Sequence, residues 1–215
     1  EPFLEANNNL QNEKVKNFFN MAYLVAVSDN TRRKRNFEQS FYKDLDLMIS
    51  SVRNFQDIVK ELNLKLGNIK IEVGDARKVL LKDESIDGII TSPPYSIALD
   101  YVANDAHSLK EFGINIPEIR ENFIGVRGKG TEKIELYNQD MMKSYEEMYR
   151  ILKRGRFAVI VIGNATYLGK EIKTVEFTID HCEKIGFKLV KDIDKIIFGL
   201  YNIMQKENIL IFQKV

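Results

Sequence analysis

The segment RFAVIVIGNA, residues 156–165, places the strongest constraint on the fold of this chain. Its apolar residues do not alternate with polar ones, so a strand formed here would be buried on both faces. Such strands lie at the centre of parallel sheets that helices cover. Helical spacing precedes it in NQDMMKSYEEMYRILKRG and follows it in VEFTIDHCEKIG, where Gly186 suits a helix end. We therefore predict an α/β fold.

The remainder of the chain divides into a helical part and a strand-containing part. Residues 1–66 show helical spacing in VKNFFNMAYLVAVS and in FEQSFYKDLDLMISSVRNFQDIVKEL, on either side of the polar loop DNTRRKRN. Two strands follow, NIKIEVGDA and IDGIITSPPY, and a long connection at 102–137 carries VRGKGTEK, which we expect to be a mobile surface loop. The strands FKLVKDIDKIIF and NILIFQKV close the chain. We predict a helical segment at 1–66 and an α/β portion at 67–215, whose sheet is mostly parallel with an antiparallel C-terminal hairpin.

Composition excludes several classes of protein. The 32 Lys and Arg residues balance the 31 Asp and Glu residues, so overall charge neither demands nor excludes a nucleic-acid partner. The single cysteine, Cys182, excludes an internal disulfide framework and fits a cytoplasmic location. His107 and His181 stand too far apart in sequence to form a zinc site with it. No apolar run approaches the roughly 18 residues of a membrane span. We predict neither a metal nor a membrane.

The strand IDGIITSPPY runs directly into an unusual turn, formed by Ser92, Pro93, Pro94 and Tyr95. Strands more often end in Gly, Asn or Asp. Each proline lacks an N–H and favours an extended conformation in the residue before it, so the turn is stiff and presents the Ser92 hydroxyl and two carbonyls as acceptors. Acceptors beside an aromatic ring suit a planar exocyclic amine. Pro-Pro-Tyr by itself also occurs in ordinary loops and in proline-motif ligands.

The turn and its flanks resemble the amino-methyltransferases, S-adenosylmethionine-dependent enzymes that methylate exocyclic nitrogens of cytosine or adenine in DNA. Their motif is D/N/S-P-P-Y/F, and serine in first place is found most often in the N4-cytosine group. VGDARKVLLKDESIDGIITSPPYSIALDY resembles the family's Gly-Asp strand end and the Asp-Tyr after the motif. YRILKRGRFAVIVIGN resembles its helix–turn–strand, with Arg154 and Arg156 in place of a Pro and a Gly. The resemblance extends over roughly residues 68–215.

This resemblance implies a Rossmann-like S-adenosylmethionine-methyltransferase sheet and a DNA methyltransferase of the restriction-modification type. Residues 92–95 match the motif that grips a base flipped out of the duplex. Asp75, after Gly74, matches the acidic strand end near the adenine of S-adenosylmethionine; as an alternative, Asp75 caps a following helix. We expect methylation of N4 of cytosine in preference to N6 of adenine. Tyr95 is expected to lie in a cleft and not in the core, so that Tyr95→Ala leaves stability almost unchanged.

Two basic stretches are candidates for contacts with DNA phosphates, and each also fits an ordinary solvated loop. The first lies between the two predicted helices and the second in the Gly-spaced loop. The candidate residues are Arg32, Arg33, Lys34, Arg35, Arg127 and Lys129.

One feature of the family is absent. Its members carry a Gly-rich loop, D/N-P-F-x-G-S-G, that cradles the methionine part of the cofactor, and this chain has no such cluster. The opening EPFLEA resembles either the start of that loop or the segment after the second strand. We expect an upstream half or a second chain to supply the loop and its strands. An oligomer is compatible with this arrangement. S-adenosylmethionine should then bind weakly to this chain alone.

Other classes of protein also fit the turn. Sibling enzymes that methylate guanine in transfer RNA, or glutamine in proteins, use a similar turn, more often with Asp or Asn at the position of Ser92. A non-catalytic nucleic-acid-binding subunit that kept the turn is a further alternative. Cytosine and adenine present a similar amine, so the turn does not by itself choose between them.

Overall fold

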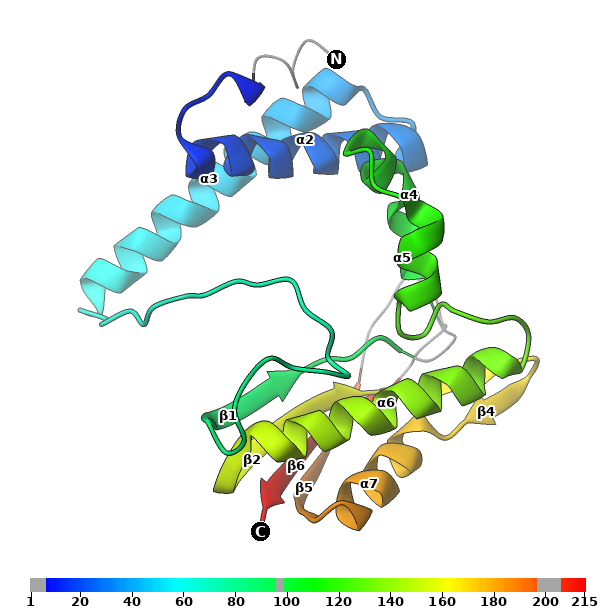
Figure 1. Ribbon diagram of the computed structural model, residues 1–215. Helices are drawn as coiled ribbons and strands as arrows, with labels where there is room; N and C mark the ends of the chain where they lie inside the picture. Colours follow the sequence, from blue (N-terminus) through cyan, green and yellow to red (C-terminus); the bar gives the residue numbers. More distant parts are fainter. Residues whose placement is uncertain (1–6, 96–98, 197–205) are drawn as a thin grey trace. The chain divides into compact units, whose positions relative to one another are not determined.

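The computed structural model describes residues 7–95, 99–196 and 206–215 (Figure 1). The chain divides into two compact units. The first consists of residues 1–71 together with 104–116, and the second of residues 72–103 together with 117–215. The helical unit thus extends slightly beyond residue 66 and also takes in a segment from the middle of the chain.

The first unit is built on two long helices, α2 (Glu13–Arg33) and α3 (Phe37–Glu61). The Asn12 side chain caps α2, because its Oδ1 accepts backbone N–H groups at 3.0 and 3.3 Å. The helices pack through a small core formed by Ala22, Tyr23, Ala26 and Phe41.

The loop expected between these helices is shorter than the sequence suggested. Helix α2 continues through Arg33 and ends at Lys34, whose φ of 56° is left-handed. Nothing in DNTRR stops a helix, and Asp29 stabilises its last turn through an ion pair of 2.9 Å with Arg33. Only residues 34–36 therefore separate the two helices.

The second unit contains a four-stranded sheet in the order β1-β2-β6-β5. Strand β1 is parallel to β2, and β6 is antiparallel to both β2 and β5, so β1, β2 and β5 share one direction. This confirms the predicted α/β class, the mostly parallel sheet and the antiparallel C-terminal hairpin. The strands are β1 (Ile86–Thr91), β2 (Leu152–Ile162), β5 (Phe187–Ile196) and β6 (Lys206–Lys214).

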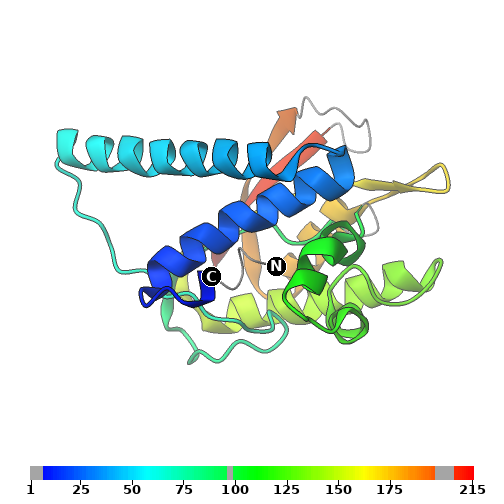
Figure 2. The ribbon, with the colours of Figure 1, turned by 90° about the horizontal axis from the view of Figure 1, so that it is seen from above.

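The core lies between this sheet and two helices, α6 (Glu132–Ile151) and α7 (Thr174–Lys184), which lie on the same face of the sheet (Figures 1 and 2). On that face of β2, Ala158, Ile160 and Ile162 are fully buried. Strand β2 is central, as predicted. Its opposite face is less covered within this unit, since Phe157 is 44% exposed. The sequence therefore predicted the position of β2 correctly, but burial on both faces is incomplete.

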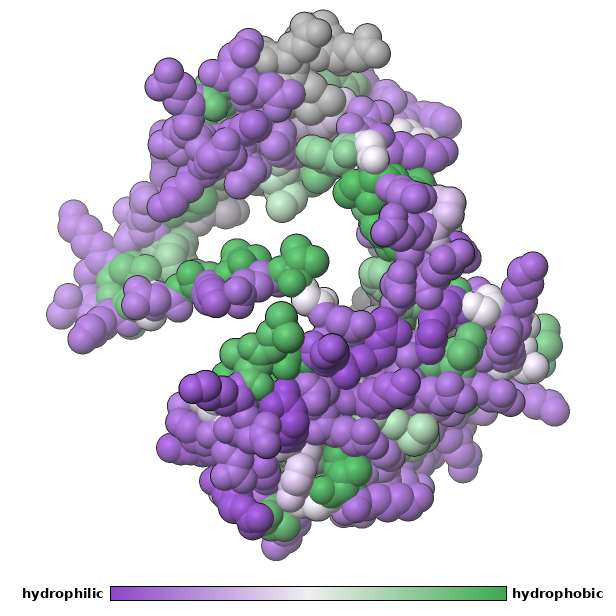
Figure 3. Space-filling view, viewed as in Figure 1, coloured by the Kyte–Doolittle hydropathy of each residue, from purple (hydrophilic) through white to green (hydrophobic). Residues whose placement is uncertain are grey.

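The strand expected at NIKIEVGDA does not form. Residues 68–74 pair with no neighbouring strand, and Asp75 makes only an isolated bridge to Lys78. Ile69, Ile71 and Val73 are 88%, 90% and 106% exposed and contribute to the hydrophobic surface visible in Figure 3. Alternating apolar and charged residues are typical of a strand, but a strand needs hydrogen-bonding neighbours to be stable. The described residues supply no such neighbour here.

The connection at 102–137 also differs from its prediction, because it contains two helices. Helix α4 spans Tyr101–Glu111 and α5 spans Ile116–Asn122. The VRGKGTEK stretch begins in turns, as expected, but Val126 within it is buried. Helix α6 already ends at Ile151, and the LKRG residues belong to β2. A small hairpin of β3 (Ala165–Tyr167) and β4 (Lys170–Ile172) follows β2.

Candidate functional site

The turn at residues 92–95 begins where β1 ends, at the carboxyl edge of the parallel pair. Thr91, the last residue of β1, pairs with Ile160 of β2. Ser92 is exposed, whereas Pro93, Pro94 and Tyr95 are half-buried. Ligands of open α/β sheets bind at the carboxyl ends of the strands. Ser92 is therefore exposed at the edge of the sheet where a ligand is expected to bind. Residues 96–98 lie outside the described part of the chain.

Tyr95 does not lie free in a cleft. Its ring packs against the main hydrophobic core, and its hydroxyl donates a hydrogen bond to Glu207 Oε1. Glu207 lies near the start of β6, and β2 separates β6 from β1, so the tyrosine side chain reaches across the end of β2. The expectation that the ring stands clear of the core is wrong, because the turn directs it back over the sheet.

The contact between Tyr95 and Glu207 has a clear electrostatic character. Burial, followed by the hydrogen bond to Glu207, raises the pKa of Tyr95 to about 12. Burial raises the pKa of Glu207 too, but the bond from Tyr95 and the ion pair with Lys195, at 3.0 Å, outweigh it and hold the pKa below its usual value. Glu207 is thus an ionised acceptor and Tyr95 a neutral donor at neutral pH.

The segment after the turn is anchored separately. Asp100 accepts hydrogen bonds from Arg120, one of them at 3.0 Å, and from the backbone N–H of Ala103 at 2.9 Å. These bonds hold the pKa of Asp100 below its usual value, with Arg120 the main cause. The Tyr101 ring stacks on Phe123, with 6.1 Å between the ring centroids. Both ends of the stretch from Tyr95 to Asp100 are therefore fixed to the α/β unit.

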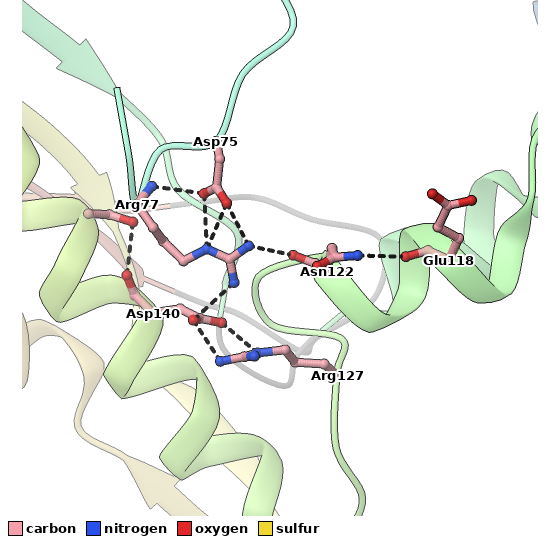
Figure 4. A network of polar contacts seen from close by, with 7 residues as sticks. Asp75, Arg77, Glu118, Asn122, Arg127 and Asp140 are labelled. Carbon is pink, nitrogen blue, oxygen red and sulfur yellow. Dashed lines mark hydrogen bonds and ion pairs between the residues drawn. The ribbon is translucent and has the colours of Figure 1, made fainter. Parts of the chain in front are cut away.

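Asp75 belongs to a cluster of charged side chains shown in Figure 4. Both of its carboxylate oxygens accept hydrogen bonds from Arg77, at 2.8 to 3.1 Å. Arg77 also donates to Asp140 at 3.1 Å, and Arg127 donates to both oxygens of Asp140 at 2.7 and 2.8 Å. Asp140, on α6, is only 1% exposed. The buried Asp140 carboxylate thus binds both Arg77 and Arg127, and Arg77 in turn binds Asp75.

The expected cofactor-binding residues are Gly74 and Asp75, and both are exposed. The Asp75 carboxylate is occupied by Arg77, which also holds its pKa below the usual value. A Cβ atom added to Gly74 would meet nothing within 4 Å, so this glycine does not mark a close approach of other atoms. Asp75 is followed by a turn and not by a helix, so its predicted alternative role as a helix cap is wrong.

The predicted phosphate-binding residues fall into different units. Arg33 and Arg35 form ion pairs with Asp29 at 2.9 and 2.7 Å, while Arg32 and Lys34 are exposed. In the α/β unit Lys129 is exposed, whereas the Arg127 guanidinium is turned toward Asp140. A role in binding nucleic acid stays a prediction for all six residues.

Sequence reasoning missed Glu207, Lys195, Arg77 and Asp140. Asp140 carried a usable signal, because it is one turn away from Tyr137 and Ser144 on the buried face of α6. A carboxylate at such a position requires cationic partners. Glu207 carried no comparable signal, since it is a charged residue near the start of a strand. Among the described residues there is no group of three or more side chains suited to a metal ion, and no helix that could cross a membrane.

Comparison with curated proteins identifies relatives of the chain, although no family model matches it. It is 29% identical to the type II methyltransferase M.MjaII of Methanocaldococcus jannaschii over 164 residues, which cover 69% of this chain and 28% of the relative. It is 33% identical to M.MjaI of the same organism over 132 residues, covering 56% of this chain and 42% of the relative. The chain is related to type II methyltransferases. The predicted resemblance to DNA amino-methyltransferases is thereby confirmed, and the chain spans less than half the length of either relative.

Solved structures of methyltransferases show a more distant likeness. The PvuII DNA methyltransferase, described as cytosine-N4-specific, is 15% identical with a TM-score of 0.46, over 66% of this chain and 48% of that one. An S-adenosylmethionine-dependent methyltransferase from Methanosarcina mazei is 11% identical with a TM-score of 0.45, over 71% and 70%.

Proposed function

We propose that this methyltransferase relative carries the base-binding turn of a DNA methyltransferase, which transfers a methyl group from S-adenosylmethionine to an exocyclic amine, N4 of cytosine in preference to N6 of adenine. The observation that carries the proposal is the stiff Ser92-Pro93-Pro94-Tyr95 turn at the carboxyl end of β1, with Ser92 exposed. The type II methyltransferases among its relatives support DNA as the substrate and a role in restriction-modification.

The chemistry of the turn suits an exocyclic amine. The Ser92 hydroxyl and the carbonyls of Ser92 and Pro93 would accept the amine hydrogens and so draw the nitrogen lone pair out of conjugation with the ring. The Tyr95 ring would stack on the flipped base. S-adenosylmethionine, when bound, supplies a methyl group already activated by a sulfonium. The protein's own contribution is therefore position and electrostatics.

The described residues do not by themselves fit the cofactor. Asp75 is engaged by Arg77, Gly74 has open space around it, and the sequence holds no Gly-rich loop. Ile90, in the strand that leads to the turn, is 84% exposed, and β1 is an edge strand whose second side is unpaired among the described residues. We propose that further polypeptide, from an upstream half or a second chain, pairs with this edge and completes the cofactor site.

Titration calorimetry tests this incompleteness. The 215-residue chain alone is expected to bind S-adenosylmethionine weakly, with a dissociation constant on the order of 1 mM or above, because its sequence holds no Gly-rich loop to supply backbone donors for the methionine end. Circular dichroism before the titration checks that the titrated chain is folded. Tight one-to-one binding by the monomeric chain would show that the cofactor site is complete.

The methylated product tests the reaction itself. The natural full-length protein, incubated with DNA and S-adenosylmethionine, is expected to yield N4-methylcytosine, with N6-methyladenine second, after digestion to nucleosides and mass analysis. A protein with Ser92→Ala and Tyr95→Ala together is the matched control. Methylation at C5 of cytosine would refute the proposal. Labelled methyl groups on transfer RNA or protein, with none on DNA, would favour the sibling enzymes.

A further inference from the structure

We infer that Glu207 is a positioning residue for the Tyr95 ring in the base-binding turn, an inference that rests on the proposed function. The Glu207 side chain is 11% exposed, and each of its carboxylate oxygens has its own partner. Oε1 accepts the Tyr95 hydroxyl, and Oε2 lies 3.0 Å from Lys195 Nζ. The Ser92 side chain also hydrogen-bonds to the Tyr95 hydroxyl, but it belongs to the same turn, whereas Glu207 reaches the hydroxyl from β6.

The geometry explains why this contact would matter for stacking. Two prolines precede Tyr95 and stiffen the backbone that leads into it. At the other end of the side chain, Glu207 holds the hydroxyl. A ring that stacks on a base must keep one plane, and rotation about the bonds of its side chain would change it. The hydrogen bond to Glu207 opposes that rotation. Glu207 would therefore act on the base only through Tyr95.

Lys195 contributes to this arrangement by holding the second oxygen of the carboxylate. Lys195 and Glu207 lie opposite each other on the paired strands β5 and β6, so the hairpin fixes their separation. With one oxygen bound to Lys195, the other faces the tyrosine. The C-terminal hairpin thus orients a side chain that belongs to the turn after β1.

Replacing Glu207 tests the inference. In the natural full-length protein, Glu207→Ala is expected to raise the KM for DNA about tenfold, the equivalent of one hydrogen bond to a charged group. Glu207→Gln should keep the KM for DNA close to the wild-type value, because its amide oxygen still accepts a hydrogen bond from the Tyr95 hydroxyl. Asp194→Ala, which removes an exposed carboxylate of the same hairpin, is the matched control and should leave the KM unchanged.

A double-mutant cycle separates positioning from a general effect on the fold. If Glu207 acts through the tyrosine hydroxyl, the double variant Glu207→Ala/Tyr95→Phe should have nearly the same KM for DNA as Tyr95→Phe alone. A second readout is the 13C resonance of Tyr95 Cζ, identified by its loss in Tyr95→Phe. It should shift in Glu207→Ala and not in Asp194→Ala.

The outcomes are distinguishable. If the wild-type protein is active and the KM for DNA is the same in Glu207→Ala and Asp194→Ala, the inference is overturned. It is also overturned if Glu207→Ala raises the KM of the Tyr95→Phe protein as much as it raises the KM of the wild type. An unchanged Tyr95 resonance in Glu207→Ala overturns it as well. A wild-type protein that methylates no DNA refutes the proposed function instead, and the positioning role falls with it even if the resonance shifts.

Discussion

Tyr95→Ala is expected to lower the catalytic efficiency of DNA methylation by roughly 10- to 100-fold, because a base-stacking platform is worth about 1–3 kcal/mol. Tyr95→Phe should be intermediate, since it keeps the ring but loses the hydrogen bond to Glu207. Single-turnover methyl transfer at saturating cofactor, in the natural full-length protein, measures the effect. Full activity in Tyr95→Ala would show that the ring does not grip the base.

The same substitution should also reduce stability, contrary to the expectation from sequence. The Tyr95 ring packs against the core of the α/β unit, so its removal is expected to lower the free energy of unfolding by on the order of 2 kcal/mol. Tyr42, which is 58% exposed on α3, offers a control in which Ala should change neither activity nor stability by a comparable amount. Activities should therefore be compared per folded molecule, with the folded fraction measured by circular dichroism.

Asp140→Ala is expected to cause the largest loss of stability, on the order of 3 kcal/mol. It would leave the guanidinium groups of Arg77 and Arg127 without their shared carboxylate, and that carboxylate is only 1% exposed. The value lies at the low end for a broken buried pair because both arginines partly reach solvent. Urea unfolding measures the loss as a lower transition midpoint.

The control for Asp140→Ala is Asp180→Ala, an exposed carboxylate on α7 in the same unit. It should change the free energy of unfolding by no more than about 0.5 kcal/mol, as is usual for surface substitutions. Equal midpoints for the two variants would mean that the ion-pair cluster contributes nothing to stability. Asp140→Ala would remove one of the two carboxylates bound to Arg77 and leave its direct bonds to Asp75 in place.

Local patterns were sufficient for the elements that carry their own signal. The unbroken apolar residues of RFAVIVIGNA predicted the central strand, and the two consecutive apolar stretches FKLVKDIDKIIF and NILIFQKV predicted the hairpin. The NIKIEVGDA stretch has an equally regular pattern, yet it forms no strand, because pairing depends on a neighbour that the pattern does not supply. The helices inside 102–137 lacked strong periodicity and were missed for that reason.

The sequence by itself determined the α/β class, the stiff acceptor-rich turn at residues 92–95 and the relationship to methyltransferases, because each depends on neighbouring residues or on their order along the chain. Only the tertiary structure decided which side chains meet at the site. Glu207 is 112 positions from Tyr95, and Asp140 is 63 positions from Arg77. Contacts over such separations arise from the order and register of strands β1, β2 and β6 and from the packing of α6 on the sheet. A charged residue carries no local sign of the partner that this packing brings to it.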